Sequence, residues 1–304
     1  MLRLTFLGTS AAQPTIGRNL TGLAIRRERE LFLLDCGEGT QRQMIRYGTG
    51  FDVAAIFFTH FHADHYLGLL GFLRTLHMQG REAPLALYGP APARSLLDRA
   101  LHLGFEDYLF PVTITELEGG AKVQLDGAVV EALPVEHGMP ALGYALREAE
   151  RPGTFHPDRA AALGVPEGPL FGKLQHGEPV TLGSGRRVDP GEVLGPPRPG
   201  RKLVLSGDTR PCEAVRHAAR GADLLVHEST FEARDLARAK ETSHSTAREA
   251  ASLARSAGVR RLALTHFSSR YEERLQQLGE EARAEFPEVT LAYDGLSIEV
   301  PLVD

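Results

Sequence analysis

The sequence predicts an α/β fold built from two similar halves. Short apolar runs rich in β-branched and aromatic residues alternate with segments of helical spacing along most of the chain. Two of the runs, Ile56-Phe-Phe and Leu262-Ala-Leu, each lead into the same Thr-His-Phe sequence. The 304 residues, of which 42% are hydrophobic, suffice for a large domain with a substantial core. We therefore expect two halves packed face to face, with functional loops at the strand ends.

Each element follows from its local pattern. Helices are expected at about Gln41–Tyr47, after the glycine-containing turn Asp35-Cys-Gly-Glu-Gly-Thr, at Tyr66–Met78, and at Ala247–Ala257, capped by Ser245 or Thr246. Strands are expected wherever a short apolar run is bounded by polar or turn residues. These runs are Leu2–Leu7, Gly22–Ile25, Leu31–Leu34, Val53–Phe58, Leu85–Tyr88, Val123–Leu125, Val129–Pro134, Lys202–Ser206, Asp223–His227 and Leu262–Thr265.

The composition changes between Arg151 and Lys202. This 52-residue stretch contains 10 Gly and 9 Pro, and it carries eight basic against five acidic side chains. The rest of the chain is acidic, because the formal net charge of the whole is −5. The stretch is either a long surface loop or an inserted flexible arm that touches an anionic partner.

Composition also excludes several classes of protein. Cys36 and Cys212 are the two cysteines, so no disulfide framework is expected, and a reducing cytoplasm is the expected location. No apolar run approaches the roughly 20 residues of a membrane-spanning helix, and the N-terminus turns polar too early for a signal peptide. The acidic net charge argues against a protein that coats nucleic acid through bulk charge.

A dense cluster of metal-binding side chains follows the strand expected at Val53–Phe58. His60, His62, Asp64 and His65 form the pattern H-x-H-x-D-H. On extended chain His60 and His62 point the same way, whereas Asp64 and His65 can turn toward a second point nearby. Imidazole and carboxylate groups suit zinc, and also manganese. A surface histidine cluster without metal is the alternative reading.

Three further candidates stand where other apolar strands stop: His137, Asp208 and His266. With the cluster they supply ligands for two metals. One metal would take His60, His62 and His137, the other Asp64, His65 and His266, and Asp208 would bridge them. Two metal ions roughly 3.5 to 4 Å apart can clamp the attacking and leaving oxygens of an in-line displacement.

The remaining histidines divide into two groups. His227, in His-Glu-Ser-Thr, is a candidate partner for a metal ligand, and His244, in Thr-Ser-His-Ser-Thr, is either a mobile proton donor or a structural residue. The others have no ligand-like neighbours and are expected to be solvated or structural; they are His77, His102, His156, His176 and His217.

Motifs along nearly the whole chain resemble those of the short-form ribonuclease Z family, the tRNA 3′-processing endonucleases of the metallo-β-lactamase superfamily. They are Phe6-Leu-Gly-Thr-Ser, Asp35-Cys-Gly-Glu-Gly-Thr-Gln, Thr59-His-Phe-His-Ala-Asp-His with Gly68, Glu136-His-Gly, Gly168-Pro, Ser206-Gly-Asp-Thr-Arg, His227-Glu-Ser-Thr, His244-Ser-Thr and Leu264-Thr-His-Phe-Ser-Ser-Arg-Tyr. The His-rich cluster identifies only the superfamily. The resemblance is narrowed from the superfamily to the ribonuclease Z family by three segments: Gly-Asp-Thr-Arg, His-Ser-Thr and Thr-His-Phe-Ser-Ser-Arg-Tyr.

The resemblance implies a metallo-β-lactamase fold. This is a four-layer αββα sandwich in which residues 1–304 form a single domain with an inserted, protruding arm at about 151–202. It also implies two Zn²⁺ per subunit at the ligands assigned above, Asp64 as proton acceptor, and His244 as proton donor oriented by Glu228. Ser268 and Arg270 would hold the scissile phosphate or a nearby nucleotide. Gly168 and Pro169 would lie in the arm that grips tRNA, and the enzyme would be a homodimer.

The implied reaction is hydrolysis of precursor tRNA after the discriminator base, which leaves a tRNA 3′-hydroxyl and a trailer 5′-phosphate. One departure from the family pattern is Ser229, where Ala is common. A second is that the arm is only mildly basic. Two alternatives stay open: a hydrolase of small esters, such as a cyclic-nucleotide phosphodiesterase or thiolesterase, which would not need the arm, and a non-catalytic RNA-binding protein that uses metal only to fold.

Overall fold

The computed structural model describes residues 1–103 and 108–303, and the chain divides into two compact units. The first unit comprises Met1–Leu125, Val129–Leu146 and Lys202–Pro301. The second is formed mainly by Arg147–Arg201. Every histidine and aspartate that the sequence assigns to the metal site therefore belongs to the first unit.

One seven-stranded sheet is built largely from the N-terminal half of the chain. Its spatial order is β18 (Ser297–Glu299), β1 (Leu2–Gly8), β3 (Gly22–Arg27), β4 (Glu30–Leu34), β5 (Val53–Phe57), β6 (Leu85–Gly89) and β7 (Val112–Glu116). β1 pairs antiparallel with both β18 and β3, whereas β4 to β7 run parallel to one another. The carboxyl ends of the parallel strands thus meet at one edge, where ligands commonly bind in α/β sheets.

A second seven-stranded sheet repeats this arrangement. Its order is β17 (Val289–Leu291), β15 (Leu262–Thr265), β14 (Leu224–Glu228), β13 (Lys202–Leu205), β10 (Leu142–Glu148), β9 (Ala128–Pro134) and β8 (Lys122–Leu125). β13, β14, β15 and β17 are parallel. A short parallel pairing of β2 (Ser10–Ala11) with β16 (Phe267–Ser268) joins the two halves beside the strand ends.

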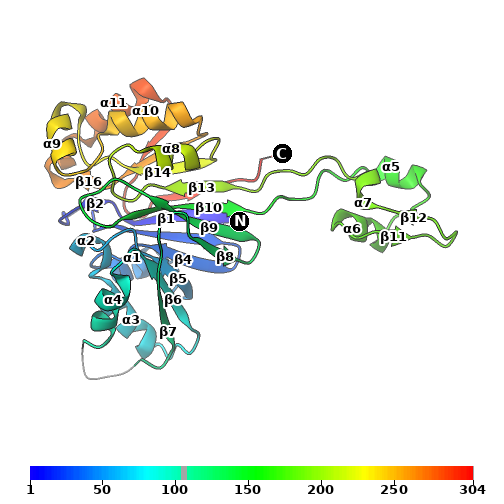
Figure 1. Ribbon diagram of the computed structural model, residues 1–304, viewed down its shortest axis with the longest axis horizontal. Helices are drawn as coiled ribbons and strands as arrows, with labels where there is room; N and C mark the ends of the chain where they lie inside the picture. The colour runs from blue at the N-terminus through cyan, green and yellow to red at the C-terminus, as the bar shows by residue number, and fades with distance from the viewer. Residues whose placement is uncertain (104–107, 304) are drawn as a thin grey trace. The chain divides into compact units, whose positions relative to one another are not determined.

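Helices cover the outer faces of the two sheets, as Figure 1 shows. The first sheet carries α1 (Thr40–Tyr47), α3 (Leu69–Met78) and α4 (Ala93–Leu101), and the second carries α8 (Glu213–Ala218), α9 (Leu236–Glu241), α10 (Ala247–Ala257) and α11 (Leu275–Glu285). Apolar side chains of the inner faces, Tyr144 and Phe57 among them, form a third core between the sheets. The layers are therefore αββα, and the metallo-β-lactamase fold is confirmed.

The expected helix at Tyr66–Met78 is wrong in one respect. The structure has a single turn, α2 (Ala63–Tyr66), followed by α3 from Leu69. The break falls at Gly68, whose backbone packs against Gly37 so closely that a Cβ atom there would lie 1.9 Å from the Gly37 carbonyl oxygen. Asp64 and His65 project from the short helical turn α2.

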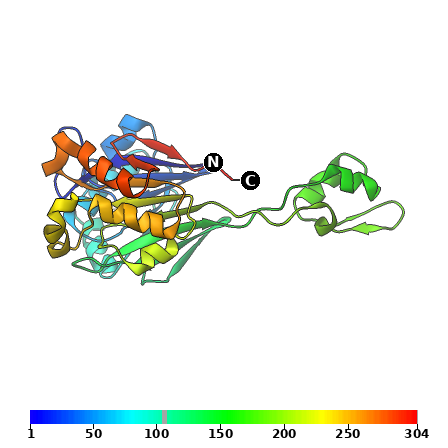
Figure 2. The same cartoon turned by 90° about the horizontal axis from the view of Figure 1, so that it is seen from above.

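The Pro- and Gly-rich stretch is more ordered than a bare loop. The second unit, drawn in green in Figure 2, holds α5 (Pro157–Ala162), α6 (Pro169–Gln175), α7 (Pro190–Val193) and the hairpin β11 (Val180–Thr181) and β12 (Arg187–Val188). Each of the three helices begins with a proline, which suits the first helical position because its missing N–H would have no partner there. Ala160, Val165, Leu174, Val180, Val188 and Val193 form a small buried core. That this unit serves as a tRNA-binding arm stays a prediction.

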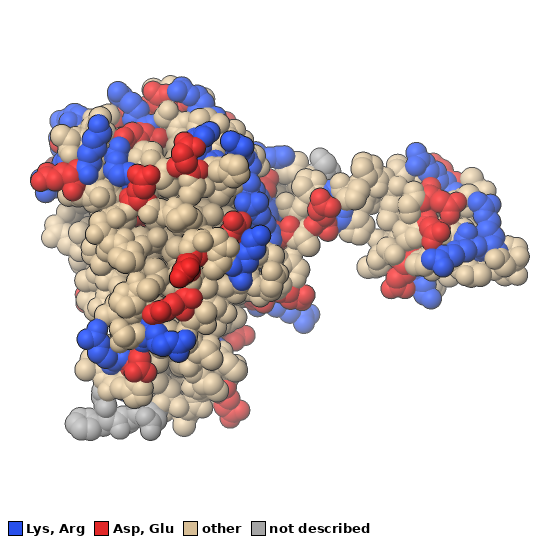
Figure 3. Space-filling model, viewed as in Figure 1, with Lys and Arg blue, Asp and Glu red and all other residues tan. Residues whose placement is uncertain are grey.

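Basic and acidic side chains are interspersed on the second unit, as the face in Figure 3 shows. Arg187 pairs with Asp189, and Arg186 lies 3.7 Å from Glu192. Within residues 1–103 and 108–303, every helix is too short or too polar to span a bilayer.

Candidate metal centre and active site

The ends of parallel strands bring the predicted metal ligands together. His60 and His62 follow β5, and Asp64 and His65 lie in the helical turn α2. In the second half, Asp208 follows β13, and His266 follows β15. His266 has a φ of 58°, a left-handed backbone that turns its ring back toward the strand ends. His137 arrives from the loop after β9, so four separate segments converge on this point.

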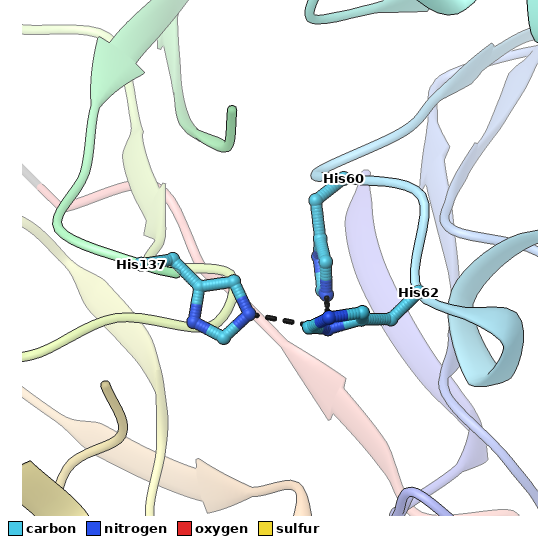
Figure 4. Close-up of side chains that lie close together, drawn as sticks. All are labelled: His60, His62 and His137. Atoms are coloured by element: carbon cyan, nitrogen blue, oxygen red, sulfur yellow. Dashed lines mark hydrogen bonds between the residues drawn. The ribbon is translucent and has the colours of Figure 1, made fainter. Parts of the chain in front are cut away.

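His60, His62 and His137 form the first group, shown in Figure 4. Nε2 of His60 lies 2.9 Å from Nδ1 of His62, and Nε2 of His137 lies 3.2 Å from the same atom. His60 is fully buried, whereas His62 is exposed and His137 half-buried. Three imidazole nitrogens thus face one point at the edge of the site.

Asp64, His65 and His266 form the second group. Oδ2 of Asp64 lies 3.5 Å from Nε2 of each histidine, and the two Nε2 atoms are 3.3 Å apart. All three residues are buried.

Asp208 lies between the two groups. Its Oδ2 is 3.7 Å from Nε2 of His60, 3.4 Å from Nε2 of His65 and 3.2 Å from Nε2 of His266. Burial alone would raise the pKa of Asp208, but the facing imidazoles of His266 and His65 hold that pKa well below its usual value. The carboxylate is therefore ionised, and its position is that of a group shared by both sets of ligands.

The donor set fits divalent cations. Burial, reinforced by His65, lowers the pKa of His60, so its ring is neutral and its nitrogen lone pair is free to bind a metal. Neutral imidazole and ionised carboxylate are the ligands that mixed nitrogen and oxygen zinc sites use. Within the described residues, five groups of three such side chains each have their ligand atoms within 4.8 Å of one another. This clustering at one buried edge supports a divalent metal centre.

A surrounding layer of hydrogen bonds fixes the ligand rings. Nδ1 of His65 lies 2.7 Å from Oδ2 of Asp35, which also accepts a hydrogen bond from the Thr59 hydroxyl. Nδ1 of His266 meets the Thr230 hydroxyl at 2.9 Å, and Nδ1 of His137 meets the Ser243 carbonyl oxygen at 3.1 Å. Such contacts set which ring nitrogen faces the metal. The sequence reasoning assigned no role to Asp35, although it also stands directly after a strand.

The backbone of Ala12 orients Asp64. The Ala12 N–H donates to Oδ2 of Asp64 at 2.7 Å, from a residue with a φ of 61°. The loop that holds this amide is tied down by Asp294, which accepts hydrogen bonds from the Thr9 hydroxyl and from the Asn19 N–H. Asp294 lies just before β18, so the last part of the chain supports one wall of the site.

His244 and Glu228 form a buried pair beside the ligands. Nδ1 of His244 lies 2.8 Å from Oε1 of Glu228 and 3.9 Å from Oδ2 of Asp208. Burial alone would lower the pKa of His244, but the Glu228 carboxylate, and after it Asp208, raises that pKa to about 9. The imidazole is therefore protonated at neutral pH. His227 is also buried, and its Nδ1 donates to the Glu228 carbonyl oxygen at 2.8 Å.

The centre opens into a cleft of about 390 Å³. Of the residues predicted from the sequence, His62, Asp64, Asp208, His244, His266, Ser268 and Arg270 line it. The Arg270 guanidinium donates to the Ser268 hydroxyl at 3.1 Å and lies 5.5 Å from the centre of the Phe231 ring. The sequence reasoning missed Phe231, Arg238 and Thr242, which also line the cleft. Nothing in their local sequence distinguishes them from ordinary helix and loop residues.

Two of the predicted site residues lie outside the first unit. Gly168 and Pro169 belong to the second unit, where Pro169 begins α6 and Gly168 has a φ of 131°. Among the described residues, the histidines expected to be structural lie outside the metal-binding groups; they are His77, His102, His156, His176 and His217.

Known proteins share this arrangement of sequence and fold. The family described as "Beta-lactamase superfamily domain" matches residues 31–165 and 171–267. The chain is 62% identical over 305 residues to a protein of Myxococcus xanthus named Ribonuclease Z, covering 100% of this chain and 99% of that one. It is 50% identical to the Ribonuclease Z of Methanosarcina acetivorans, covering 99% of each chain. The solved structure of human tRNase Z, short form, superimposes with a TM-score of 0.71 at 27% identity, over 98% of this chain and 99% of that one.

Proposed function

The chain belongs to the ribonuclease Z family of the β-lactamase superfamily, and on that basis we propose how its residues remove the 3′ trailer of precursor tRNA. It is a hydrolytic endonuclease that processes tRNA 3′ ends. The observation that carries the mechanism is one cleft, lined by four of the seven candidate metal ligands and by His244, whose imidazole pairs with the buried Glu228 carboxylate. The cut falls after the discriminator base and leaves a tRNA 3′-hydroxyl and a trailer 5′-phosphate.

We propose a site for two zinc ions, with manganese as a chemically suitable substitute. The first ion would be held by His60, His62 and His137, and the second by Asp64, His65 and His266. Asp208 would be shared by both. When bound, such a pair would polarise the phosphodiester, activate the attacking water and neutralise developing charge. The distances of Asp208 to His60 and to His266, 3.7 and 3.2 Å, support its shared role.

Asp64 accepts the proton of the attacking water. Its carboxylate is buried and lines the cleft, and the Ala12 N–H fixes one of its oxygens. Burial alone would raise the pKa of Asp64, but the hydrogen bond with His266 and the nearby imidazoles lower it, so the group is ionised at neutral pH. An ionised, oriented carboxylate is the form that a proton acceptor needs.

His244 delivers a proton to the leaving ribose 3′-oxygen. Since Nδ1 of His244 is engaged by Glu228, Nε2 is the nitrogen that remains for the substrate. Glu228 is itself anchored by the Thr209 N–H and the Thr230 hydroxyl, at 3.1 and 2.8 Å. The pair therefore supplies a charged acid in a fixed orientation, which is the arrangement that general acid catalysis requires.

Basic side chains in the cleft hold the RNA near the cut. Arg270, oriented by Ser268 and by the Phe231 ring, binds the scissile phosphate or a neighbouring one. Arg238 lines the same cleft from α9 and binds a flanking phosphate. The guanidinium fork suits phosphate oxygens better than a lysine ammonium does.

The second unit binds tRNA, with Gly168 and Pro169 at its tRNA-contacting surface. We also propose a homodimer, in which the partner copy supplies the second unit that binds the tRNA. Exposed apolar side chains on and beside α1 to α4 support the dimer; they are Ile45, Leu67, Met78, Leu103 and Leu109. Sedimentation of the wild type and of Leu67→Asp would test it, and a monomeric wild type would contradict it.

The cytoplasm is the proposed location, since Cys36 and Cys212 are both free.

The first experiment is cleavage of a precursor tRNA that bears a 3′ trailer, with and without a chelator, followed by mapping of both ends. We expect one chelator-sensitive cut after the discriminator base. A cut elsewhere, or an uncut precursor alongside hydrolysis of a small phosphodiester, would overturn the proposed substrate while leaving the metal centre intact.

A further inference from the structure

Arg210 links the metal site to the backbone of the proton donor. It stands two residues after Asp208, in the loop between β13 and α8. Its Nη1 donates to the carbonyl oxygen of His244, and also to Oε2 of Glu249 at 2.9 Å. Its Nη2 donates to Oε1 of the same glutamate, so the pair is bidentate. The side chains of Arg210 and Glu249 are only 17% and 26% exposed, which shields the pair from water.

Glu249 fixes the segment that follows His244. Its Oε2 accepts hydrogen bonds from the N–H and the hydroxyl of Thr246, both at 3.0 Å, and its own N–H donates to the Thr246 hydroxyl at 3.2 Å. This reciprocal cap begins α10. The guanidinium of Arg210 therefore joins the carbonyl of His244 to the first turn of a rigid helix.

A second contact from the same loop reinforces the first. The Ser245 hydroxyl donates to the Thr209 carbonyl oxygen at 2.6 Å. On the side away from the cap, Ser243 has a φ of 58°, a backbone conformation that a serine rarely adopts. His244 thus sits between a strained residue and a helix start. Its own N–H donates to the Ala239 carbonyl oxygen at 2.8 Å, and the contacts that Arg210 and Ser245 supply hold its carbonyl side.

We propose that Arg210 is a positioning residue, which fixes the backbone of His244 and with it the point from which the imidazole reaches the leaving group. The inference rests on the proposed function, in which His244 is the general acid. In that step the phosphorus to 3′-oxygen bond breaks, and its electron pair passes to the oxygen. That oxygen takes the proton from Nε2 of His244, while the water oxygen bonds to phosphorus and its proton passes to Asp64.

The test uses two versions of one precursor tRNA that differ in a single atom. In one, the leaving atom is the natural 3′-oxygen; in the other it is sulfur, which departs as a thiolate and needs no proton. A residue that positions the acid affects only the oxygen substrate. A residue that merely supports the fold or the metal ligands affects both substrates alike.

Single-turnover rates and bound metal are measured for Arg210→Met, Arg210→Lys and Glu249→Gln. We expect Arg210→Met to slow the oxygen substrate roughly 10- to 100-fold and the sulfur substrate less than about threefold, with metal content unchanged, since general acid catalysis contributes roughly 10² to 10⁴. Arg210→Lys and Glu249→Gln retain part of the hydrogen-bond network. Their rates on the oxygen substrate are expected to lie between those of Arg210→Met and the wild type. Arg216→Met is the matched control, because Arg216 also forms a bidentate pair with a glutamate, Glu213, on the outer face of α8.

His244→Ala provides the reference that separates this inference from the proposed function. It is expected to slow only the oxygen substrate. If His244→Ala slows both substrates equally, the general-acid assignment fails. If His244→Ala is selective but the Arg210 and Glu249 variants are not, the positioning role fails while the acid assignment stands. Should Arg210→Met not fold, the ratio of the two rates in Arg210→Lys and Glu249→Gln decides the matter in the same way.

Discussion

Nδ1 of His244 lies 2.8 Å from Oε1 of Glu228, and both side chains are largely removed from solvent. An imidazolium beside a buried carboxylate retains its proton to a higher pH than a free imidazole does. Burial opposes this effect, yet the pKa of His244 is raised to about 9. The pair therefore holds one proton at neutral pH, next to the site where phosphodiester cleavage is proposed.

The pH dependence of cleavage follows from this pair. Because the acid form of His244 is the active one, the single-turnover rate is expected to fall as the pH rises through about 9. Glu228→Gln removes the charge that retains the proton, so the fall is expected to move to lower pH. Rates measured from neutral to strongly alkaline pH test this. A fall at the same pH in His244→Ala would show that another group controls it.

Removal of the shared carboxylate is expected to remove metal and activity together. Asp208 is buried among His60, His65 and His266, so Asp208→Ala leaves their rings facing one another without a bridging anion. Elemental analysis of the purified variant and cleavage of precursor tRNA measure the two effects. Asp98→Ala, on the exposed face of α4, is the control and is expected to match the wild type. A fully active Asp208→Ala would contradict the shared role.

A methyl group at Gly68 is expected to disturb the turn that carries Asp64 and His65. The added Cβ would lie 1.9 Å from the Gly37 carbonyl oxygen, and the three nearest atoms, from Gly37 and Cys36, are all backbone atoms that cannot rotate away. We expect Gly68→Ala to lower the free energy of unfolding by about 1–3 kcal/mol, and to bind less metal. Urea denaturation and metal analysis test this. Gly172→Ala, where no atom lies within 4 Å of the added Cβ, should lose no stability.

Removal of the second unit is expected to separate tRNA processing from the chemistry. Arg151 and Arg198 pair as antiparallel neighbours, so the chain ends left by deleting both residues and the segment between them are close enough for a short glycine turn. The deletion should retain metal and hydrolysis of a small phosphodiester, but raise the KM for precursor tRNA. An unchanged KM would exclude a tRNA-binding role for this unit.

Cys36 is expected to resist alkylation in the folded protein. Its side chain is fully buried, and burial raises the pKa of the thiol to about 12, so the reactive thiolate is scarce. In a Cys212→Ser background, iodoacetamide should label the chain only after denaturation. Rapid labelling of the native protein would show that the β4–α1 turn opens.

The sequence points to the candidate ligands more readily than to the residues that hold their rings. His60, Asp208 and His266 are found from sequence because each follows an apolar strand, and the strands of an α/β sheet end at one edge. Asp35 and Thr230 hold two of the ligand rings, but these contacts join segments 30 and 36 residues apart. No local pattern encodes such pairings, which are set only when the sheets assemble.

The dependence on contacts between distant segments also explains why some strands and helices were missed in the sequence. β10 packs between β9 and β13, but its glycine and proline neighbours make Leu142–Glu148 resemble a loop when the sequence is read alone. Helix α11 has few apolar positions, and Gly279 among them weakens the helical pattern of the sequence. Its residues Leu275, Leu278 and Ala282 nevertheless pack into the core beneath the helix. In the second unit, three of the nine prolines that suggested a loop, Pro157, Pro169 and Pro190, stand at the starts of helices.

The pairing of β18 with β1 has a consequence for synthesis on the ribosome. β1 lacks one of its two neighbours until residues 297–299 have left the exit tunnel. Asp294, which secures the loop that orients Asp64, emerges only shortly before them. A nascent chain therefore carries all seven candidate ligands before the loop that orients Asp64 is secured, and we expect nuclease activity only after residues 294–299 have joined the fold.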